Sequence, residues 1–440
     1  MTAKAFEEKS FWMTTADYTP NPPLKEPLEV DVAIIGGGFT GLSSAYHIKK
    51  AAPGTSVAVL ESQIIGHGAS GRNGGFNMTL FGLTMSITSL RFGRQKAREA
   101  HLYMEKAVDT TRDLIRDLGI DCDYEHPGFL RVATSPHYQK RICHEIELAH
   151  SLGITGIEWM EKDKLQEQVR SPLYQGAWWE PRCGILNPAK LSWGWKKVIT
   201  AMGVQVFEST PVTAVTSEGA KVSIQTPGGV VKAKKAVLAA NAWSHLLPHI
   251  RHKQVPIWTY IVLTEPLSDK IFEEIGWQNR QGIEDARNLV HYYRLTADNR
   301  LLMGGRDVGL AFGGDMNKDE NPQTFEGLEQ DVRDIFPALK DTRFTHRWGG
   351  PVSVTLDLAP AMGYVGDKRM IYSLGCMGHG VSLTHLNGKT VADLILEKQT
   401  DLTDVFFVNR KTIPWPPEPV RMLASKALVG ALHLQDHFTD

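Results

Sequence analysis

A short apolar run, residues 31–41 (DVAIIGGGFTG), ends in three spaced glycines. Gly36 permits a tight turn from strand to helix, Gly38 lets backbone approach a phosphate, and Gly41 allows the helix to pack closely on the strand. Glu61, at the end of a second apolar run, supplies a carboxylate that accepts ribose hydroxyls. The sequence therefore predicts a βαβ unit that binds a dinucleotide, with an ordinary βαβ turn as the alternative. The predicted contacts of this unit are Gly36, Gly38, Phe39, Thr40, Gly41, Glu61 and Ser62.

The segment after Glu61 reads SQIIGHGASGRNGGF and is rich in glycine, serine and asparagine. Such a segment can run extended along a long cofactor and donate backbone N–H groups to it, whereas the alternative is a flexible loop. It resembles the corresponding segment of the D-amino acid oxidase–glycine oxidase superfamily, and GASGRNGG is most similar to the gamma-glutamylputrescine oxidase-like amine oxidoreductases. The resemblance implies FAD as cofactor, contacted by Ala69, Ser70, Gly71, Arg72, Asn73, Gly74 and Gly75.

The resemblance extends over residues 10–400 and has further anchors. It implies cofactor contacts from VQVFESTPVTAVT at 204–216, from AVLAANAWS at 236–244, and from a glycine-rich turn that opens a helix within 372–395. The N-terminus of that last helix would direct its positive end toward the reduced flavin, and His379 is a candidate for tuning the flavin, or else a simple backbone cap. These implied contacts are Val212, Ala240, Asn241, Trp243, Gly375, Gly378, His379, Gly380, Val381 and Ser382.

Composition limits the other classes of function. A net charge of −1 with 22% charged residues gives no electrostatic case for nucleic acid. The four cysteines lack CxxC or metal-ligand spacing, which predicts no metal site and reduced thiols in a cytoplasmic protein. The first twelve residues carry charges where a signal peptide would be apolar, and no integral membrane segment is predicted. The oligomeric state stays open.

A chain of 440 residues predicts two lobes in an α/β architecture. We expect a discontinuous Rossmann-like FAD-binding domain and an α+β substrate domain with an antiparallel sheet, as in glutathione reductase-like and D-amino acid oxidase-like folds. The FAD-binding domain is predicted at 28–90, 160–245 and 345–400, and the substrate domain at 91–159 and 246–344. The tail, 401–440, contains an amphipathic helix that we expect to dock on its own domain, with a membrane or dimer contact as alternatives.

No second GxGxxG motif follows a predicted strand and the chain has no redox CxxC, so electrons should reach the flavin from an organic substrate. The resemblance implies oxidation of a C–N bond in a small amine: hydride passes to flavin N5, and the imine hydrolyses to an aldehyde plus ammonia or an amine. The electron acceptor is O2, forming H2O2, or a carrier. Catalysis then rests on orientation, and no essential acid–base residue is predicted.

Two cationic side chains that relatives use are absent from this chain, and their absence bears on the substrate. Glycine oxidase-like members carry an arginine where Val352 follows the Trp348 motif, and sarcosine oxidase-like members carry a lysine where this chain has Ser382. This favours an ω-substituted amine without an α-carboxylate, such as a polyamine derivative or an aminophosphonate. The alternatives are an α- or N-methyl-amino acid oxidase or dehydrogenase that uses Arg294 or Arg306, and a non-catalytic flavin redox sensor. The predicted substrate contacts are Asn77, Tyr260, His291, Tyr293, Arg294, Trp348 and Val352.

Covalent attachment of the flavin is not expected. Family members with a flavin-linked histidine carry it near the position of Arg72, and those with a linked cysteine carry it near Pro351 and Val352. The sequence therefore predicts non-covalent FAD.

Overall fold

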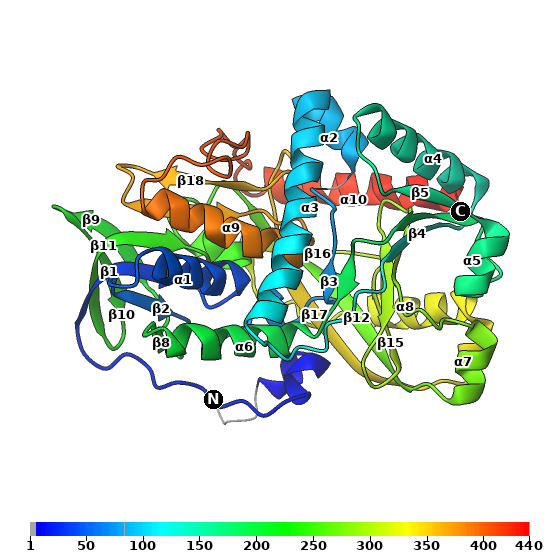
Figure 1. The fold of residues 1–440 in the computed structure, drawn as a ribbon, viewed down its shortest axis with the longest axis horizontal. Coiled ribbons are helices and arrows are strands. Elements are labelled where there is room, and N and C mark those ends of the chain that lie inside the picture. The colour runs from blue at the N-terminus through cyan, green and yellow to red at the C-terminus, as the bar shows by residue number, and fades with distance from the viewer. Residues whose placement is uncertain (1–5, 83, 440) are drawn as a thin grey trace.

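The computed structural model describes residues 6–82 and 84–439, and its elements form two sheets with helices around them (Figure 1). Residues 1–5, within the segment where no signal peptide is predicted, and residue 440, at the end of the predicted tail, lie outside the described residues. Within the described ranges, no helix is long and apolar enough to cross a membrane.

The first sheet has eight strands and a parallel centre. Its main path runs β18-β19-β11-β1-β2-β8, and β10 and β9 continue from β11 as antiparallel neighbours. Of the main path, only β18 is antiparallel to its neighbour, so the centre is the predicted Rossmann-like core. The bounds are β1 (Leu28–Ile35), β2 (Val57–Leu60), β8 (Gln205–Phe207), β9 (Ala214–Glu218), β10 (Lys221–Thr226), β11 (Gly229–Leu238), β18 (Ala361–Val365) and β19 (Met370–Leu374).

Two helices of this lobe cross closely and place their N-termini near one another. Helix α1 (Phe39–Ala51) packs on α9 (Gly380–Ile395), with α6 (Pro188–Ala201) beside α1. A Cβ at Gly388 would lie 2.3 Å from the Ser43 hydroxyl, so glycine there permits the close crossing. Both helices begin at glycine-rich turns, which brings residues more than 300 positions apart to one site.

The second sheet has nine strands and is mostly antiparallel. Its order is β16-β12-β15-β14-β13-β4-β6-β5, with β17 also paired to β12, and only β13 and β4 run parallel. The bounds are β4 (Phe129–Ala133), β5 (Glu158–Glu161), β6 (Gly176–Glu180), β12 (Val255–Pro266), β13 (Gly282–Asp285), β14 (His291–Leu295), β15 (Arg300–Gly305), β16 (Gly309–Leu310) and β17 (Phe344–Val354). An apolar core lies between one face of this sheet and helices α5 (Lys162–Gln168), α7 (Asp269–Ile275) and α8 (Pro322–Ile335).

The sheets divide the chain at points that differ from the predicted boundaries. Strand β6 pairs with β4, and β17 pairs with β12 over ten residue pairs, so both belong to the second sheet although the prediction assigned 160–245 and 345–400 to the nucleotide lobe. Helix α3 (Arg94–Asp117), predicted in the substrate lobe, packs on α9 of the first. Short apolar runs carry no information on which of two sheets they join, because that depends on pairing across long stretches of chain.

The remaining helices cover the second lobe. They are α2 (Met85–Phe92), α4 (Pro136–Ser151) and α10 (Val420–Thr439), with a short ladder of β3 (Phe76–Asn77) and β7 (Gly184–Ile185) between the lobes. The tail forms the helix α10, which reaches the region of α4 and β5 (Figure 1). It is held there by hydrogen bonds to its own chain, such as that from the Ser135 hydroxyl to the carbonyl of Thr439, 2.7 Å.

Candidate active site

A cavity of about 530 Å³ lies where elements of the two sheets meet. It is lined by the starts of α1 and α9 from the first lobe, and by β12, β14 and the loop at 286–290 from the second. Of the predicted cofactor contacts, these line it: Gly38, Phe39, Thr40, Ala69, Ser70, Arg72, Asn73, Gly74, Asn241, Gly378, His379, Gly380 and Val381. The structure therefore brings the three glycine-rich segments to one place.

The turn before α1 has the geometry that a phosphate-binding turn needs. Gly36 has φ +110°, and a Cβ there would lie 2.6 Å from the carbonyl oxygen of Ala239. Gly38 precedes the first turn of α1, and the Phe39 N–H donates to the Ser70 hydroxyl, 2.9 Å. Because the N-terminal N–H groups of a helix attract anions, this end suits a pyrophosphate.

Glu61 lies beside this turn rather than in the cavity. Its carboxylate accepts from the backbone N–H groups of Gly37, 2.7 Å, and Gln63, 2.9 Å. Burial raises its pKa, although both N–H groups act in the other direction. The predicted acidic residue is thus fixed against the glycine turn, and its contact with a ribose stays a prediction.

The glycine-rich segment at 68–75 is held by polar contacts from both lobes. Arg72 is buried, and its guanidinium donates to Asp319, 2.7 Å, and to the carbonyl of His67, 2.7 Å. The indole of Trp348 donates to the carbonyl of Arg72, 2.8 Å. Trp348, predicted to contact substrate, is absent from the cavity lining and instead supports this segment.

The turn before α9 presents a histidine with one unpartnered ring nitrogen among the described residues. Gly375 has φ +76°, and its N–H donates to the Ser353 hydroxyl, 3.1 Å. His379 stands directly before α9, and its Nδ1 is buried with no hydrogen-bond partner among the described residues. Burial lowers the pKa of His379 to about 4, with Arg131 acting in the same direction, so the ring is neutral near pH 7.

These features fit the cofactor implied by the glycine motifs. An orphaned imidazole nitrogen and the N-terminus of α9 line the cavity and suit a polar, electron-rich ring system, whereas the N-terminus of α1 suits a pyrophosphate. The other predicted cofactor contacts are not part of the lining: Gly36, Gly41, Glu61, Ser62, Gly71, Gly75, Val212, Ala240, Trp243, Gly375 and Ser382. Ser382, for example, is buried and donates to the carbonyl of Met78, 2.6 Å.

Strands β12 and β14 each turn one face to the cavity and the other to the core. Thr259 and Tyr292 line the cavity, whereas Tyr260, His291 and Tyr293 do not. Tyr260 packs edge-to-face on Phe325 of α8, and Tyr293 bonds to the hydroxyl of Tyr174, 2.7 Å. Tyr260, His291 and Tyr293 therefore lie on the opposite face, because side chains alternate with a period of two and the prediction did not fix the phase.

Two further predicted substrate contacts do not line the cavity. Arg294 is buried and donates to three backbone carbonyls, that of Leu186 at 2.7 Å, that of Leu295 at 3.0 Å and that of Gly75 at 3.3 Å. Burial lowers the pKa of Arg294 to about 9. Asn77 donates to the carbonyl of Val108, 3.1 Å. Val352 alone of the predicted substrate contacts lines the cavity.

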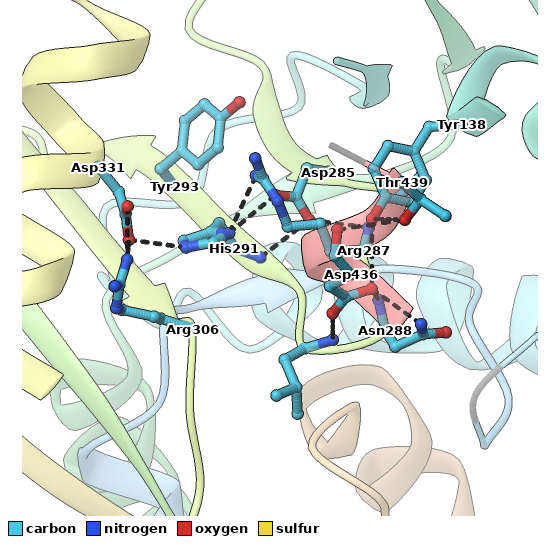
Figure 2. Close-up of polar contacts among 12 residues, drawn as sticks. Tyr138, Asp285, Arg287, Asn288, His291, Tyr293, Arg306, Asp331, Asp436 and Thr439 are labelled. Carbon is cyan, nitrogen blue, oxygen red and sulfur yellow. Dashed lines mark hydrogen bonds and ion pairs between the residues drawn. The ribbon is translucent and has the colours of Figure 1, made fainter. Parts of the chain in front are cut away.

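Charged residues that the sequence did not single out form the wall of the second lobe. Arg131 bonds to Glu284, 3.0 Å, and Arg287 bonds to Asp285, 2.5 Å. Figure 2 shows Asp285 at the centre of a network that extends through His291 to Asp331 and Arg306. Arg306 does line the cavity, but its guanidinium bonds to Asp331, 2.6 Å. No local motif marks these residues, because strands and loops far apart in sequence bring them together.

Comparison with known proteins agrees with this geometry. A family model described as FAD dependent oxidoreductase matches residues 31–394. The gamma-glutamylputrescine oxidoreductase of Escherichia coli (strain K12) is 33% identical over 411 residues, 92% of this chain and 93% of that protein. The glycine oxidase of Bacillus licheniformis is 26% identical over 393 residues, 87% of this chain and 97% of that protein. A solved glycine oxidase from Geobacillus kaustophilus has a TM-score of 0.72 at 20% identity, covering 87% of this chain and 100% of that chain.

A dinucleotide-binding lobe, a substrate lobe and a shared cavity define a flavoprotein of the D-amino acid oxidase type. The chain belongs to the FAD dependent oxidoreductase family. The predicted fold class, FAD as the cofactor and the assignment as an amine oxidoreductase are thereby confirmed, whereas non-covalent binding of the FAD stays a prediction. The redox-sensor alternative has no support from this assignment.

Proposed function

We propose that this enzyme oxidises the terminal C–N bond of an ω-substituted amine that carries no carboxylate at the reacting carbon. The observation that carries the proposal is the valine at 352, which presents an apolar side chain to the cavity where carboxylate-binding relatives are expected to place arginine. Ser382, at the second expected cation position, is buried and bonded to backbone. A similar relative, named for gamma-glutamylputrescine, supports an amine of the polyamine-derivative class.

Bound FAD supplies the two-electron acceptor for the hydride that leaves the carbon next to nitrogen. The oxidised amine is an imine, which water converts to an aldehyde plus ammonia or an amine. We propose O2 or a carrier as the final electron acceptor, and a cytoplasmic location in keeping with four free cysteines.

The protein residues bind and orient rather than exchange protons. The cofactor contacts named above would hold FAD, with the N-termini of α1 and α9 near its polar groups. Ile257, Ile261 and Val352 would exclude water from the reacting carbon, which strengthens the electrostatic effect of the helix N-termini. His379, neutral near pH 7, would offer a hydrogen bond without a competing charge.

The α-amino acid alternative has weaker support. Of the two arginines that this alternative was predicted to use, Arg294 does not line the cavity and bonds to backbone carbonyls, and Arg306 is paired with Asp331. An arginine held by its own carboxylate partner must give up that bond before it can bind a substrate carboxylate.

The test is anaerobic stopped-flow reduction of the purified holoenzyme. The panel contains acylated putrescines, aminoalkylphosphonates, N-methyl amines and α-amino acids. Fast bleaching of the flavin band by amines without an α-carboxylate, with α-amino acids inert, is the expected result. Bleaching chiefly by α-amino acids would overturn the proposal and direct attention to Arg306.

A further inference from the structure

Helix α4 contributes two oppositely charged side chains to the cavity. Arg141 and Glu145 stand one helical turn apart, and both line it. In Figure 1, α4 lies on the side of the molecule away from α1 and the first sheet. Residues at i and i+4 share one face of a helix, so both side chains project from the same part of the wall. The proposed function uses neither of them.

Arg141 is a cation without a carboxylate partner. Its Nη1 donates to the carbonyl of Ala286, 3.0 Å, and to Oδ1 of Asn288, 3.1 Å. Among the residues the structure describes, no Asp or Glu forms an ion pair with it, unlike Arg131, Arg287 and Arg306 elsewhere in the wall. A guanidinium carries five N–H donors in a planar fork, so Arg141 keeps donors that a carboxylate can engage.

Glu145 is the opposite of Arg141: a carboxylate without a cationic partner among the described residues. It is 7% exposed, and its two oxygens accept only from the backbone N–H of Ser86, at 3.3 and 3.2 Å. Ser86 lies in the first turn of α2. In the described part of the chain no Lys, Arg or His forms an ion pair with Glu145, so a buried carboxylate beside the cavity lacks a cation.

The C-terminal helix fixes the surroundings of Arg141. Asp436 accepts from the N–H of Asn288, 2.9 Å, from its Nδ2, 2.8 Å, and from the N–H of Leu289, 2.9 Å (Figure 2). With its amide so held, Asn288 turns Oδ1 to Arg141. Helix α10 also lines the cavity with apolar side chains, Leu428, Val429 and Leu432. Thus one helix orients the cation and supplies an apolar surface beside it.

We propose that Arg141 and Glu145 form a second subsite, which binds the zwitterionic α-amino-acid head of a substrate whose other end is the oxidised amine. The head's carboxylate bonds to Arg141 and its ammonium to Glu145. The apolar residues of α10 cover the methylene chain between the two ends. The inference rests on the proposed function and names its substrate class: an amine that carries an α-amino acid at its far end. Asp436 acts as a positioning residue through Asn288.

Three amines that differ only in the head test this on the holoenzyme: N-(γ-glutamyl)putrescine, N-glutarylputrescine without the α-ammonium, and N-butanoylputrescine without either charge. In anaerobic reduction, the wild type should bind the first roughly 10–100-fold more tightly than the third, as charge-assisted pairing implies. Arg141→Gln should remove most of that preference and leave N-butanoylputrescine unchanged. Glu145→Gln should weaken only N-(γ-glutamyl)putrescine. Lys140→Gln, an exposed neighbour on α4, is the matched control.

A second readout does not depend on turnover. N-(γ-glutamyl)butylamine lacks the terminal amine, and its binding to the oxidised holoenzyme is followed by the change in flavin absorbance. Its Kd should rise in Arg141→Gln and, by a smaller factor, in Asp436→Asn, while the limiting reduction rate with N-butanoylputrescine stays constant. Arg141→Lys, which keeps the charge but loses the fork, should fall between wild type and Arg141→Gln.

The failures are distinguishable. If N-butanoylputrescine reduces the flavin as well as N-(γ-glutamyl)putrescine at equal concentrations, the subsite is wrong and the proposed function stands. If none of the three amines reduces it while α-amino acids do, the proposed function itself is wrong. Equal loss for all three amines in Arg141→Gln would make Arg141 a structural residue and also overturn the subsite.

Discussion

The two ends of the cavity differ in the atoms that line them: backbone atoms at the end in the first lobe and charged side chains at the end in the second lobe. At the first-lobe end, glycine-rich backbone forms much of the surface, as at Gly38, Gly378 and Gly380. At the second-lobe end, long charged side chains form it, such as Arg131 and Glu284. A backbone surface is shared by every member of a fold that binds one cofactor, whereas a side-chain surface can change by single substitutions without changing the fold. Cofactor binding should therefore be hard to alter, and substrate preference easy.

The largest effect is expected at the backbone end, from Gly41→Ala. A Cβ at this position would lie 2.1 Å from the carbonyl oxygen of Gly36, a backbone atom that cannot move without opening the turn. We expect FAD affinity to fall at least ~10-fold, in line with the cost of overpacking, or the protein to fail to fold. The measurement is the flavin-to-protein ratio after purification, with the midpoint of thermal unfolding. Gly54→Ala, where nothing lies within 4 Å, is the control. Full flavin content in Gly41→Ala would contradict the steric account.

A smaller effect, on stability alone, is expected from Arg294→Leu, because Arg294 is a buried charge that lines neither end of the cavity. Its guanidinium bonds to three buried carbonyls and lies outside the cavity lining. Loss of these bonds should lower the free energy of unfolding by roughly 2–4 kcal/mol. The Kd for amines, measured on the folded fraction, should not change.

Arg306→Gln is the matched comparison, since its ion pair with Asp331 is partly exposed. Such pairs contribute about 1 kcal/mol or less, so this variant should unfold near the wild type in a chemical denaturation series. A selective rise in the Kd of α-amino acids in either variant would favour the α-amino acid alternative.

The same contrast explains what could be predicted from sequence. The turn before α1 was predictable because its requirement is local: glycine residues at fixed spacing satisfy a close approach that other residues cannot. Which residues of strand β12 face the cavity was not predictable. The run VPIWTYIVL is apolar on both faces, and a strand that is buried on both sides lacks the alternation that marks the inward face. Hence Tyr260 was assigned to the cavity, although it lies in the core.

Arg141 and Glu145 show the other limit. They form a polar pair on an amphipathic helix, which from sequence alone is indistinguishable from a solvated surface pair. Their position beside the cavity depends on tertiary contacts with α2, the loop at 286–290 and α10, which the sequence does not indicate. Sheet membership of β6 and β17 has the same origin, since pairing partners are set by tertiary contacts.

The pH dependence of stability should also differ between the ends. At the first end, His379 is neutral, since burial lowers its pKa to about 4. At the second, burial opposes the charge of His291, but Asp285 and Asp331 outweigh it and raise the pKa to about 9. A raised pKa contributes stability that is fully present below the unfolded value, about 6.5, and is lost as pH rises through 9. A lowered pKa acts in the opposite way, so His379 reduces stability as pH falls from about 6.5 toward 4.

The check is chemical denaturation of wild type and His291→Gln between pH 6.5 and 9.5, extended for wild type and His379→Gln down to about pH 4. Wild type should lose stability on the order of 1–3 kcal/mol more than the variant over this range. His379→Gln should leave the alkaline limb unchanged and reduce the loss on the acid side. Parallel alkaline limbs for wild type and His291→Gln would show that the histidine is not charged in the native state.

The smallest effect, and the finest test of the comparison, uses adjacent tyrosines on β14. Tyr292 lines the cavity, and Tyr293 bonds to Tyr174 in the core. Tyr293→Phe should lower the free energy of unfolding by about 0.5–1.5 kcal/mol, the value of one buried hydrogen bond, with amine binding unchanged. Tyr292→Phe should leave stability within about 0.5 kcal/mol of wild type but alter the amine Kd or the reduction rate by a few-fold. The reverse result would mean that the strand presents its other face to substrate, and that the cavity wall assigned to β12 and β14 is one residue out of phase.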